Sequence, residues 1–240
     1  MKENVFKRYE LKYMLSTEQY EKIIKIIQEH MSIDKYGEST IQSLYYDTPN
    51  KLLIRRSIEK PNYKEKIRVR SYGLAKANQS VFLELKKKAD GIVYKRRISI
   101  DEQKSIQFFK GNETLGTTQI EKEINYFKNL YKDLTPSMLI IYDRTPYYGD
   151  SELRVTFDKN IRYRTTDLDL HTSLEGKPIL YGDQVLMEIK VSSAYPIWLF
   201  KILSEIKAYK TSFSKYGTAY SIEYSQKNKT QEKELNIGNV

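Results

Sequence analysis

The sequence predicts an α+β fold in which about eight antiparallel β-strands each carry one apolar and one charged face. Four short segments alternate charged and apolar residues: Glu10-Leu11-Lys12, Arg68-Val69-Arg70, Glu84-Leu85-Lys86 and Glu188-Ile189-Lys190. Side chains in a β-strand alternate between faces, so the two charges of each segment point the same way. Other segments repeat apolar residues at helical spacing, which predicts helices that cover the apolar face. No linker rich in proline or glycine interrupts the chain, and this favours one domain.

The N-terminal half is predicted to contain one helix among several strands. Ser16 begins the helix and Gln19 completes a capping box. The apolar stripe of this helix consists of Tyr20, Ile23, Ile24 and Ile27. Strands are expected at residues 5–15, 39–47, 64–72, 80–87 and 92–100, with a turn at 48–50 and a hairpin turn at 88–91.

The C-terminal half is predicted to add three helices and three strands. Helices are expected at residues 101–109, 118–131 and 195–208, and strands at 137–147, 152–162 and 185–191. In the last helix Pro196 fits the first turn, and Trp198, Ile202 and Ile206 form the buried face. We expect a domain over residues 1–224, followed by a disordered polar tail over 225–240.

Composition limits the classes of function. The net charge of +10 and the pI of about 9.3 favour a polyanionic partner, such as nucleic acid, phosphates or an anionic membrane surface. No cysteine is present, which excludes disulfides and thiolate metal sites, and two distant histidines disfavour a histidine-based site. No apolar run is long enough to span a bilayer, so we expect a soluble, cytoplasmic protein without a transmembrane segment.

The charged strand faces are the main indication of function. They carry Glu10 and Lys12; Lys66, Arg68 and Arg70; Glu84 and Lys86; Lys95 and Arg97; Glu152, Arg154 and Asp158; and Glu188 and Lys190. A solvent-exposed sheet face decorated with ion pairs is one explanation. The other is a closed sheet whose lining cations bind a chain of phosphates, with a few carboxylates that hold a divalent metal. Full charges dominate these faces where Thr, Ser and Gln would be usual, which favours the second explanation.

At these residues the sequence resembles the triphosphate tunnel metalloenzymes, and among them the VTC-type polyphosphate polymerase domain. The matching segments are Arg8-Tyr9-Glu10-Leu11-Lys12-Tyr13, Ser43-Leu44-Tyr45-Tyr46-Asp47-Thr48-Pro49, Arg68-Val69-Arg70, Phe82-Leu83-Glu84-Leu85-Lys86, Tyr94-Lys95-Arg96-Arg97, Tyr142-Asp143-Arg144-Thr145, Leu153-Arg154-Val155, Glu188-Ile189-Lys190 and Ser214-Lys215-Tyr216. The superfamily typically opens with an ExExK strand, and here Arg8 replaces the first acid. This departure disfavours the cyclase and triphosphatase branches.

The resemblance implies a closed antiparallel eight-stranded β tunnel barrel with flanking helices, and it implies roles for individual residues. The residues implied to contact phosphate are Lys12, Arg68, Arg70, Lys86, Lys95, Arg144, Arg154 and Lys215. Arg97 and Lys190 are added only because they share the charged strand faces. Glu188 would be the principal ligand of Mn²⁺ or Mg²⁺. Glu10 and Glu84 either assist the metal or orient neighbouring cations, the latter being favoured for Glu84. Ser214 would donate a hydrogen bond to a phosphate oxygen.

The implied reaction is transfer of the ATP γ-phosphate to inorganic polyphosphate with release of ADP. With water as the acceptor, the same tunnel would act as a tripolyphosphatase or nucleoside triphosphatase, with Glu10 as the candidate base. A non-catalytic module that binds polyphosphate or nucleic acid is a further alternative, although a metal-type carboxylate makes nucleic acid the weaker ligand. The sequence leaves open the oligomeric state and whether a separate membrane protein is a partner.

Overall fold

The computed structural model describes residues 9–59, 61–76, 79–90, 92–150, 152–180, 182–192 and 194–225. Their contacts divide the chain into two compact units. Unit 1 lies within Met1–Thr40, Tyr142–Ile161 and Leu180–Phe213, and unit 2 within Ile41–Ile141, Arg162–Ile179 and Ser214–Val240. The predicted tail lies outside the described residues except for Ser225, which ends a helix over residues 215–225.

The strands follow the order β1-β10-β8-β7-β3-β4-β5-β6, and each pair with a defined register is antiparallel. The long strands are β1 (Tyr9–Leu15), β3 (Ser39–Asp47), β4 (Tyr63–Tyr72), β5 (Ser80–Ala89), β6 (Ile92–Asp101), β7 (Thr135–Tyr148), β8 (Arg154–Arg164) and β10 (Val185–Val191). Two short strands lie off this order, β2 (Ser32–Ile33) beside β7 and β9 (Lys177–Pro178) beside β8. The predicted α+β class, with an antiparallel sheet of eight long strands and flanking helices, is therefore confirmed.

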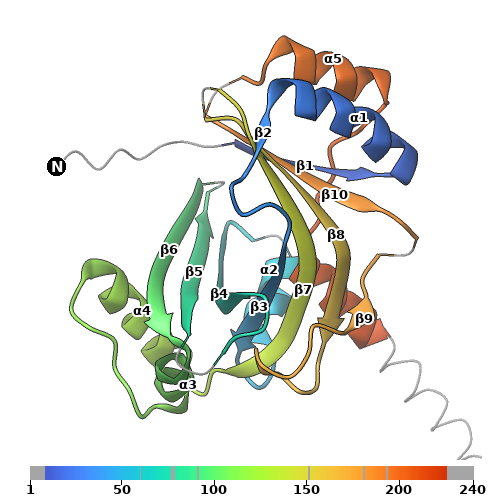
Figure 1. Ribbon diagram of the computed structural model, residues 1–240. Helices are drawn as coiled ribbons and strands as arrows, with labels where there is room; N and C mark the ends of the chain where they lie inside the picture. Colours follow the sequence, from blue (N-terminus) through green and yellow to red (C-terminus); the bar gives the residue numbers. More distant parts are fainter. Residues whose placement is uncertain are drawn as a thin grey trace, which may run out of the picture. The chain divides into compact units, whose positions relative to one another are not determined.

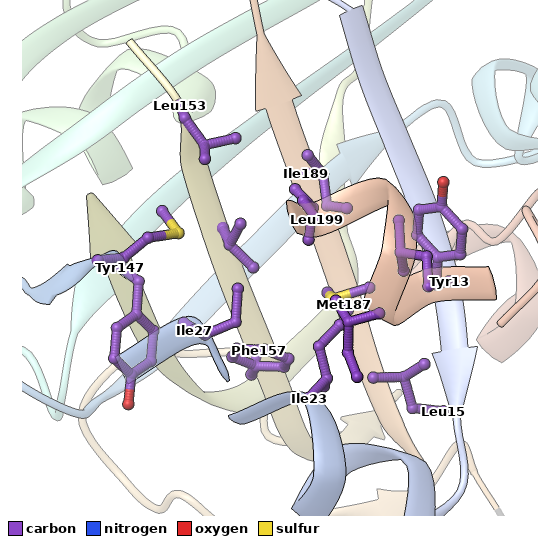
Figure 2. Packing of buried hydrophobic residues seen from close by; sticks show 14 of the residues in the cluster. Tyr13, Leu15, Ile23, Ile27, Tyr147, Leu153, Phe157, Met187, Ile189 and Leu199 are labelled. Atoms are coloured by element: carbon purple, nitrogen blue, oxygen red, sulfur yellow. The ribbon is translucent and has the colours of Figure 1, made fainter. Parts of the chain in front are cut away.

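In unit 1, helices α1 (Thr17–His30) and α5 (Ile197–Glu205) lie over the apolar face of β1, β10 and β8 (Figure 1). Figure 2 shows Ile23 and Ile27 of α1 packed against Met187 and Phe157 of the strands. The predicted capping box is present: the Gln19 backbone N–H donates to Ser16 Oγ, and the Ser16 N–H donates to the Gln19 side chain. Burial of this face leaves the charged face for the site.

Unit 2 has a second core on the corresponding face of β3, β4 and β5. Helices α3 (Glu102–Lys110) and α4 (Gln119–Leu130) supply Phe108, Ile124 and Phe127, which pack with Ile67 and Leu83. Both helices start at residues with side-chain caps, because Asp101 accepts from the Lys104 N–H and Thr118 forms a capping box with Glu121. The apolar residues again leave the charged positions on the opposite face.

Several element boundaries differ from the predictions for local reasons. Helix α5 ends at Glu205 rather than 208, because Lys207 takes a left-handed conformation with φ of 52°. Strand β8 starts at Arg154, two residues later than expected, since Glu152 has φ of 63°. Two helices were not predicted: α2 (Leu52–Ile58) and residues 215–225. Residues 5–8, with which the first predicted strand begins, lie outside the described residues.

Candidate functional site

Unit 2 holds a row of three lysines that face one another across adjacent strands. The register pairs Lys66 of β4 with Lys86 of β5, and Lys86 with Lys95 of β6. Residues directly opposite in an antiparallel pair point to the same face at close range, and like charges there are destabilising. A row of this kind is stable when an anion neutralises it.

The next row along the same strands contains the central carboxylate of the unit. It runs from Tyr45 through Arg68 and Glu84 to Arg97. Glu84 is only 2% exposed and forms ion pairs with Arg68 at 2.8 Å, with Lys95 at 2.8 Å and with Arg97 at 3.2 Å. Arg70 lies at 3.8 Å from the same carboxylate. The Glu84 carboxylate thus lies within 4 Å of four cations.

The pKa values in unit 2 follow from this excess of cations over acids around Glu84. Burial alone would raise the pKa of Glu84, but Arg68, Arg70 and Lys95 together lower it well below its ordinary value. Burial lowers the pKa of Lys95 to about 8, against the opposing effect of Glu84. The Glu84 carboxylate stays ionised, whereas the Lys95 ammonium can lose its proton in mildly alkaline solution.

Two further features of unit 2 indicate an anionic ligand. Arg97 lies with its guanidinium 3.6 Å from the Phe82 ring centroid, and its Nη2 is buried without a hydrogen-bond acceptor in the described part of the chain. Lys66 donates to Ser214 Oγ at 3.2 Å, and Ser214 in turn accepts from the Gly217 N–H at the start of the helix over 215–225. Lys215 is the first residue of that helix.

In unit 1 each row sets an acid opposite a cation, and one of the rows also sets two cations opposite each other. One row pairs Glu10 with Lys190 and Lys190 with Arg154, and the other pairs Lys12 with Glu188 and Glu188 with Thr156. Lys12 Nζ lies 3.5 Å from both Glu10 and Glu188, and Lys190 lies 3.9 Å from Glu10. Burial lowers the pKa of Lys190, with Glu188 and Glu10 opposing. Acids and cations here neutralise one another.

Arg144 is a buried cation of unit 1 with two acidic partners. Its Nε and Nη2 donate to Asp158 at 2.5 and 2.7 Å, and Nη2 also contacts Glu188 at 3.2 Å. Burial would lower the pKa of Arg144, but Asp158, Tyr142 and Glu188 raise it well above its ordinary value. Arg144 is 8% exposed, and its guanidinium orients the Glu188 carboxylate. The phosphate contact that the resemblance implies for Arg144 stays a prediction.

The described carboxylates of unit 1 do not form a ligand set of their own for a divalent ion. Among the described residues, no group of three or more acidic or histidine side chains is arranged to hold a metal. Mg²⁺, however, usually takes one or two protein carboxylates and completes its shell with substrate phosphates and water. Glu188 could supply one such carboxylate; Arg144 contacts one of its oxygens and Lys12 faces the other.

The structure thus distributes the predicted site residues over both units. Unit 1 brings together Glu10, Lys12, Arg144, Arg154, Glu188 and Lys190; unit 2 contains Arg68, Arg70, Glu84, Lys86, Lys95, Arg97, Ser214 and Lys215. The list of site residues drawn from the sequence omitted Asp158, Lys66 and Tyr45. Face parity places Asp158 and Lys66 on the charged faces and could have identified them, whereas nothing in the sequence predicts that Tyr45 opposes Arg68.

Comparisons with known proteins support a family and a fold. The model of the VTC domain family matches residues 7–224. A candidate adenylate cyclase from Bacillus halodurans has a similar fold, with a TM-score of 0.55 at 11% identity over 85% of this chain and 92% of that one. A candidate adenylate cyclase from Vibrio parahaemolyticus (TM-score 0.47, 10% identity, 89% and 97% covered) and a Pyrococcus horikoshii protein (0.46, 16%, 90% and 99%) are more distant. A search of curated proteins finds no significant match.

Proposed function

The chain belongs to the VTC domain family, and on that basis we propose that it is a metal-dependent polyphosphate polymerase. The reaction transfers the γ-phosphate of ATP to the end of an inorganic polyphosphate chain. A terminal phosphate oxygen of the chain bonds to the γ-phosphorus, the bond from that phosphorus to the β–γ bridging oxygen breaks, and ADP leaves. The balance requires no side-chain nucleophile and no further reactant.

The row formed by Lys66, Lys86 and Lys95 is the observation that carries the proposal. Three ammonium groups on directly opposed positions, next to Arg68 and Arg97, favour an anion with several charges at regular spacing. A phosphate chain provides such charges, and planar guanidinium groups bind its oxygens through paired hydrogen bonds.

Among the described residues, no helix is long and apolar enough to cross a membrane.

In this mechanism the protein acts by positioning and by neutralising charge. Phosphoryl transfer passes through a loose transition state, so fixed cations around the transferred group supply much of the catalysis. Glu188 would hold Mn²⁺ or Mg²⁺, which neutralises charge on the phosphate oxygens when bound. Arg144 and Asp158 keep the Glu188 carboxylate in one orientation. Glu10, within 4 Å of both Lys12 and Lys190, orients these cations.

The direct test is to incubate the purified protein with ATP and Mn²⁺, or Mg²⁺, and to follow ADP, orthophosphate and long-chain polyphosphate together. The amount of ADP formed should equal the amount of phosphate incorporated into long chains. Glu188→Gln should lower the rate by about 100-fold or more. Glu18→Gln is a matched control, because Glu18 is an exposed helix residue paired only with Lys22 among the contacts described.

The products distinguish the proposed reaction from its alternatives. ADP with an equal amount of orthophosphate and no chains would make the protein a triphosphatase. Tight binding of polyphosphate without ADP formation would make it a binding module. Full activity in Glu188→Gln would remove Glu188 from the mechanism.

A further inference from the structure

The segment from Ser43 to Asp47 lies on β3 and has no role in the mechanism above. Ser43, Tyr45 and Asp47 alternate along the strand and therefore share a face. The register places Ser43 opposite Arg70 and Tyr45 opposite Arg68. Strand β3 thus presents one polar group to each of the two arginines of β4.

The Arg68 guanidinium is held from both sides along its row. Its Nη1 donates to the Tyr45 hydroxyl at 2.8 Å, while Nε and Nη2 each lie 2.8 Å from the Glu84 carboxylate. A guanidinium binds a phosphate through paired, coplanar hydrogen bonds, so the orientation of its plane decides whether the contact forms. The Arg68 side chain is 22% exposed and within reach of a ligand.

Tyr45 is itself held by a second tyrosine. Its ring stacks on that of Tyr216, with centroids 4.3 Å apart and an angle of 18° between the planes. The Tyr216 hydroxyl donates to Asp47 Oδ2 at 3.0 Å and contacts Ser137 Oγ at 3.0 Å. Burial, and then the Asp47 charge, raise the pKa of Tyr216 well above its ordinary value, so the hydroxyl stays protonated as a donor.

Asp47 anchors this arrangement in the core. The residue is fully buried, and its carboxylate accepts from the backbone N–H groups of Leu53 and Ile54 at 2.9 and 3.0 Å. These N–H groups belong to the first turn of α2, whose own N-cap, Lys51, provides no side-chain bond. Asp47 therefore fixes α2, Tyr216 and the end of β3 at one point.

We propose that Tyr45 is a positioning residue that sets the plane of the Arg68 guanidinium for the phosphate chain, and that the buried Asp47–Tyr216 pair holds Tyr45 in place. The inference rests on the proposed function only in taking phosphate as the ligand of Arg68. The proposal gives a role to residues 43–47, which contain no cation but lie opposite Arg68 and Arg70.

The test is a double-mutant cycle on the affinity for tripolyphosphate, measured by titration calorimetry. Tyr45→Phe keeps the ring and its stack but removes the acceptor of Arg68, and we expect the Kd to rise about threefold to tenfold. In the Arg68→Ala background the same change should alter the Kd by less than about twofold, because its partner is absent. Tyr46→Phe is the matched control, since the buried Tyr46 ring stacks on Phe109 and its Cα opposes Ile67.

Three results would overturn the inference: an unchanged Kd in Tyr45→Phe, an equal loss in Tyr46→Phe, or an undiminished loss in the Arg68→Ala background. Tyr216 offers a second comparison. Tyr216→Phe keeps the stacked ring and should weaken binding less than Tyr216→Leu, which removes it; equal losses would exclude the stack as the support. Thermal melts of each variant separate these effects from unfolding.

Failure of the inference is distinguishable from failure of the proposed function. Coupling between Tyr45 and Arg68 in tripolyphosphate affinity, with no ADP formed from ATP by the unsubstituted protein, would retain the positioning role and reject the polymerase. ADP and polyphosphate formation without that coupling would reject the positioning role alone. Absence of tripolyphosphate binding would reject both.

Discussion

The two units balance acids and cations differently on strands of the same kind, although each contains both an acid opposite a cation and a cation opposite a cation. In unit 1 acids and cations oppose each other, as in the row that places Lys12 against Glu188. In unit 2 cations oppose cations, as in the row of Lys66, Lys86 and Lys95, and Glu84 is their central carboxylate. Alternating period-two patterns produce both arrangements, so the pattern alone does not decide which one forms.

The difference separates two kinds of site. Paired charges in unit 1 are compensated within the protein, which suits a carboxylate that must be held rigidly, such as Glu188 between Arg144 and Lys12. In unit 2 four cations share the Glu84 carboxylate, and this excess of positive charge makes a bound polyanion more favourable. We therefore expect substitutions in unit 1 to act mainly on stability and metal chemistry, and those in unit 2 mainly on phosphate affinity.

The largest effect is expected from Asp158→Asn in unit 1. The substitution leaves the buried Arg144 guanidinium without its bidentate partner, which should lower the free energy of unfolding by about 3 kcal/mol. The matched change in unit 2 is Lys95→Met, after which Arg68, Arg70 and Arg97 still surround Glu84. That change should stay within about 1 kcal/mol. Urea unfolding measures both, and similar losses in the two variants would contradict the distinction.

Lys86→Gln should separate affinity from stability in unit 2. Removing the central lysine of the row relieves repulsion from Lys66 and Lys95, so the thermal midpoint of the ligand-free protein should stay equal or rise. The Kd for tripolyphosphate should rise about tenfold, since a charged contact is lost. Lys190→Gln in unit 1 is the counterpart: it breaks the pair with Glu10 and should change the Kd by about twofold or less.

Calorimetry and thermal melts provide the two measurements for these lysine variants. A larger affinity loss in Lys190→Gln than in Lys86→Gln would place the main phosphate contacts in unit 1 and reverse the assignment. Raising the salt concentration should weaken binding by the unsubstituted protein more than binding by Lys86→Gln, because fewer charges are then screened in the variant.

The period of the sequence predicted which residues share a face, but not which residues stand opposite one another. Face parity correctly places Arg68 with Arg70 and Glu84 with Lys86. The rows depend on strand order and register, which long-range pairing decides, and a shift by one residue would place other side chains together. The burial of Arg144 depends on Asp158 of a different strand, so no local pattern could indicate it.

The two helices missed by prediction have a related explanation. Helix α2 is short and lacks a side-chain cap from Lys51; its first turn is satisfied by Asp47, which precedes it by several residues. No element was predicted for residues 215–224, yet Ser214 caps the helix there and the Tyr216 side chain is buried. Local propensity is weak in both cases, and tertiary contacts determine the helices.

The pH dependence of phosphate binding should report on Lys95. Its pKa is lowered to about 8, so the free protein loses this charge as the pH rises through 8. A bound anion favours the protonated form, and binding near pH 8 should therefore take up a proton. Between pH 7 and pH 9 the affinity should fall about threefold more than in Lys95→Arg, which keeps its charge throughout. Calorimetry in buffers of different ionisation enthalpy measures the uptake, and identical profiles for the two proteins would exclude Lys95.

The smallest effect concerns the pair of His171 and Glu102 in unit 2, which lies outside both rows of charged residues. This pair is a control for the titration of Lys95. His171 places Nδ1 2.8 Å from the Ala75 carbonyl and Nε2 2.9 Å from the buried Glu102 carboxylate. Two acceptors suit the doubly protonated ring, and the Ala75 carbonyl, followed by Glu102 and Asp169, raises the pKa of His171. A raised pKa stabilises the fold fully below the ordinary value of about 6.5 and less as the pH rises through the higher one.

The thermal midpoint should therefore fall by about one to three degrees between pH 6 and pH 8.5 through this pair, and His171→Gln should abolish that part of the slope. Tripolyphosphate affinity in His171→Gln should keep the full pH dependence assigned to Lys95, because the histidine belongs to neither row. If His171→Gln flattened the affinity profile as well, the titration near pH 8 would not belong to Lys95. The contrast between the two units would then rest on charge arrangement alone, without the proton uptake that a lysine with a lowered pKa predicts.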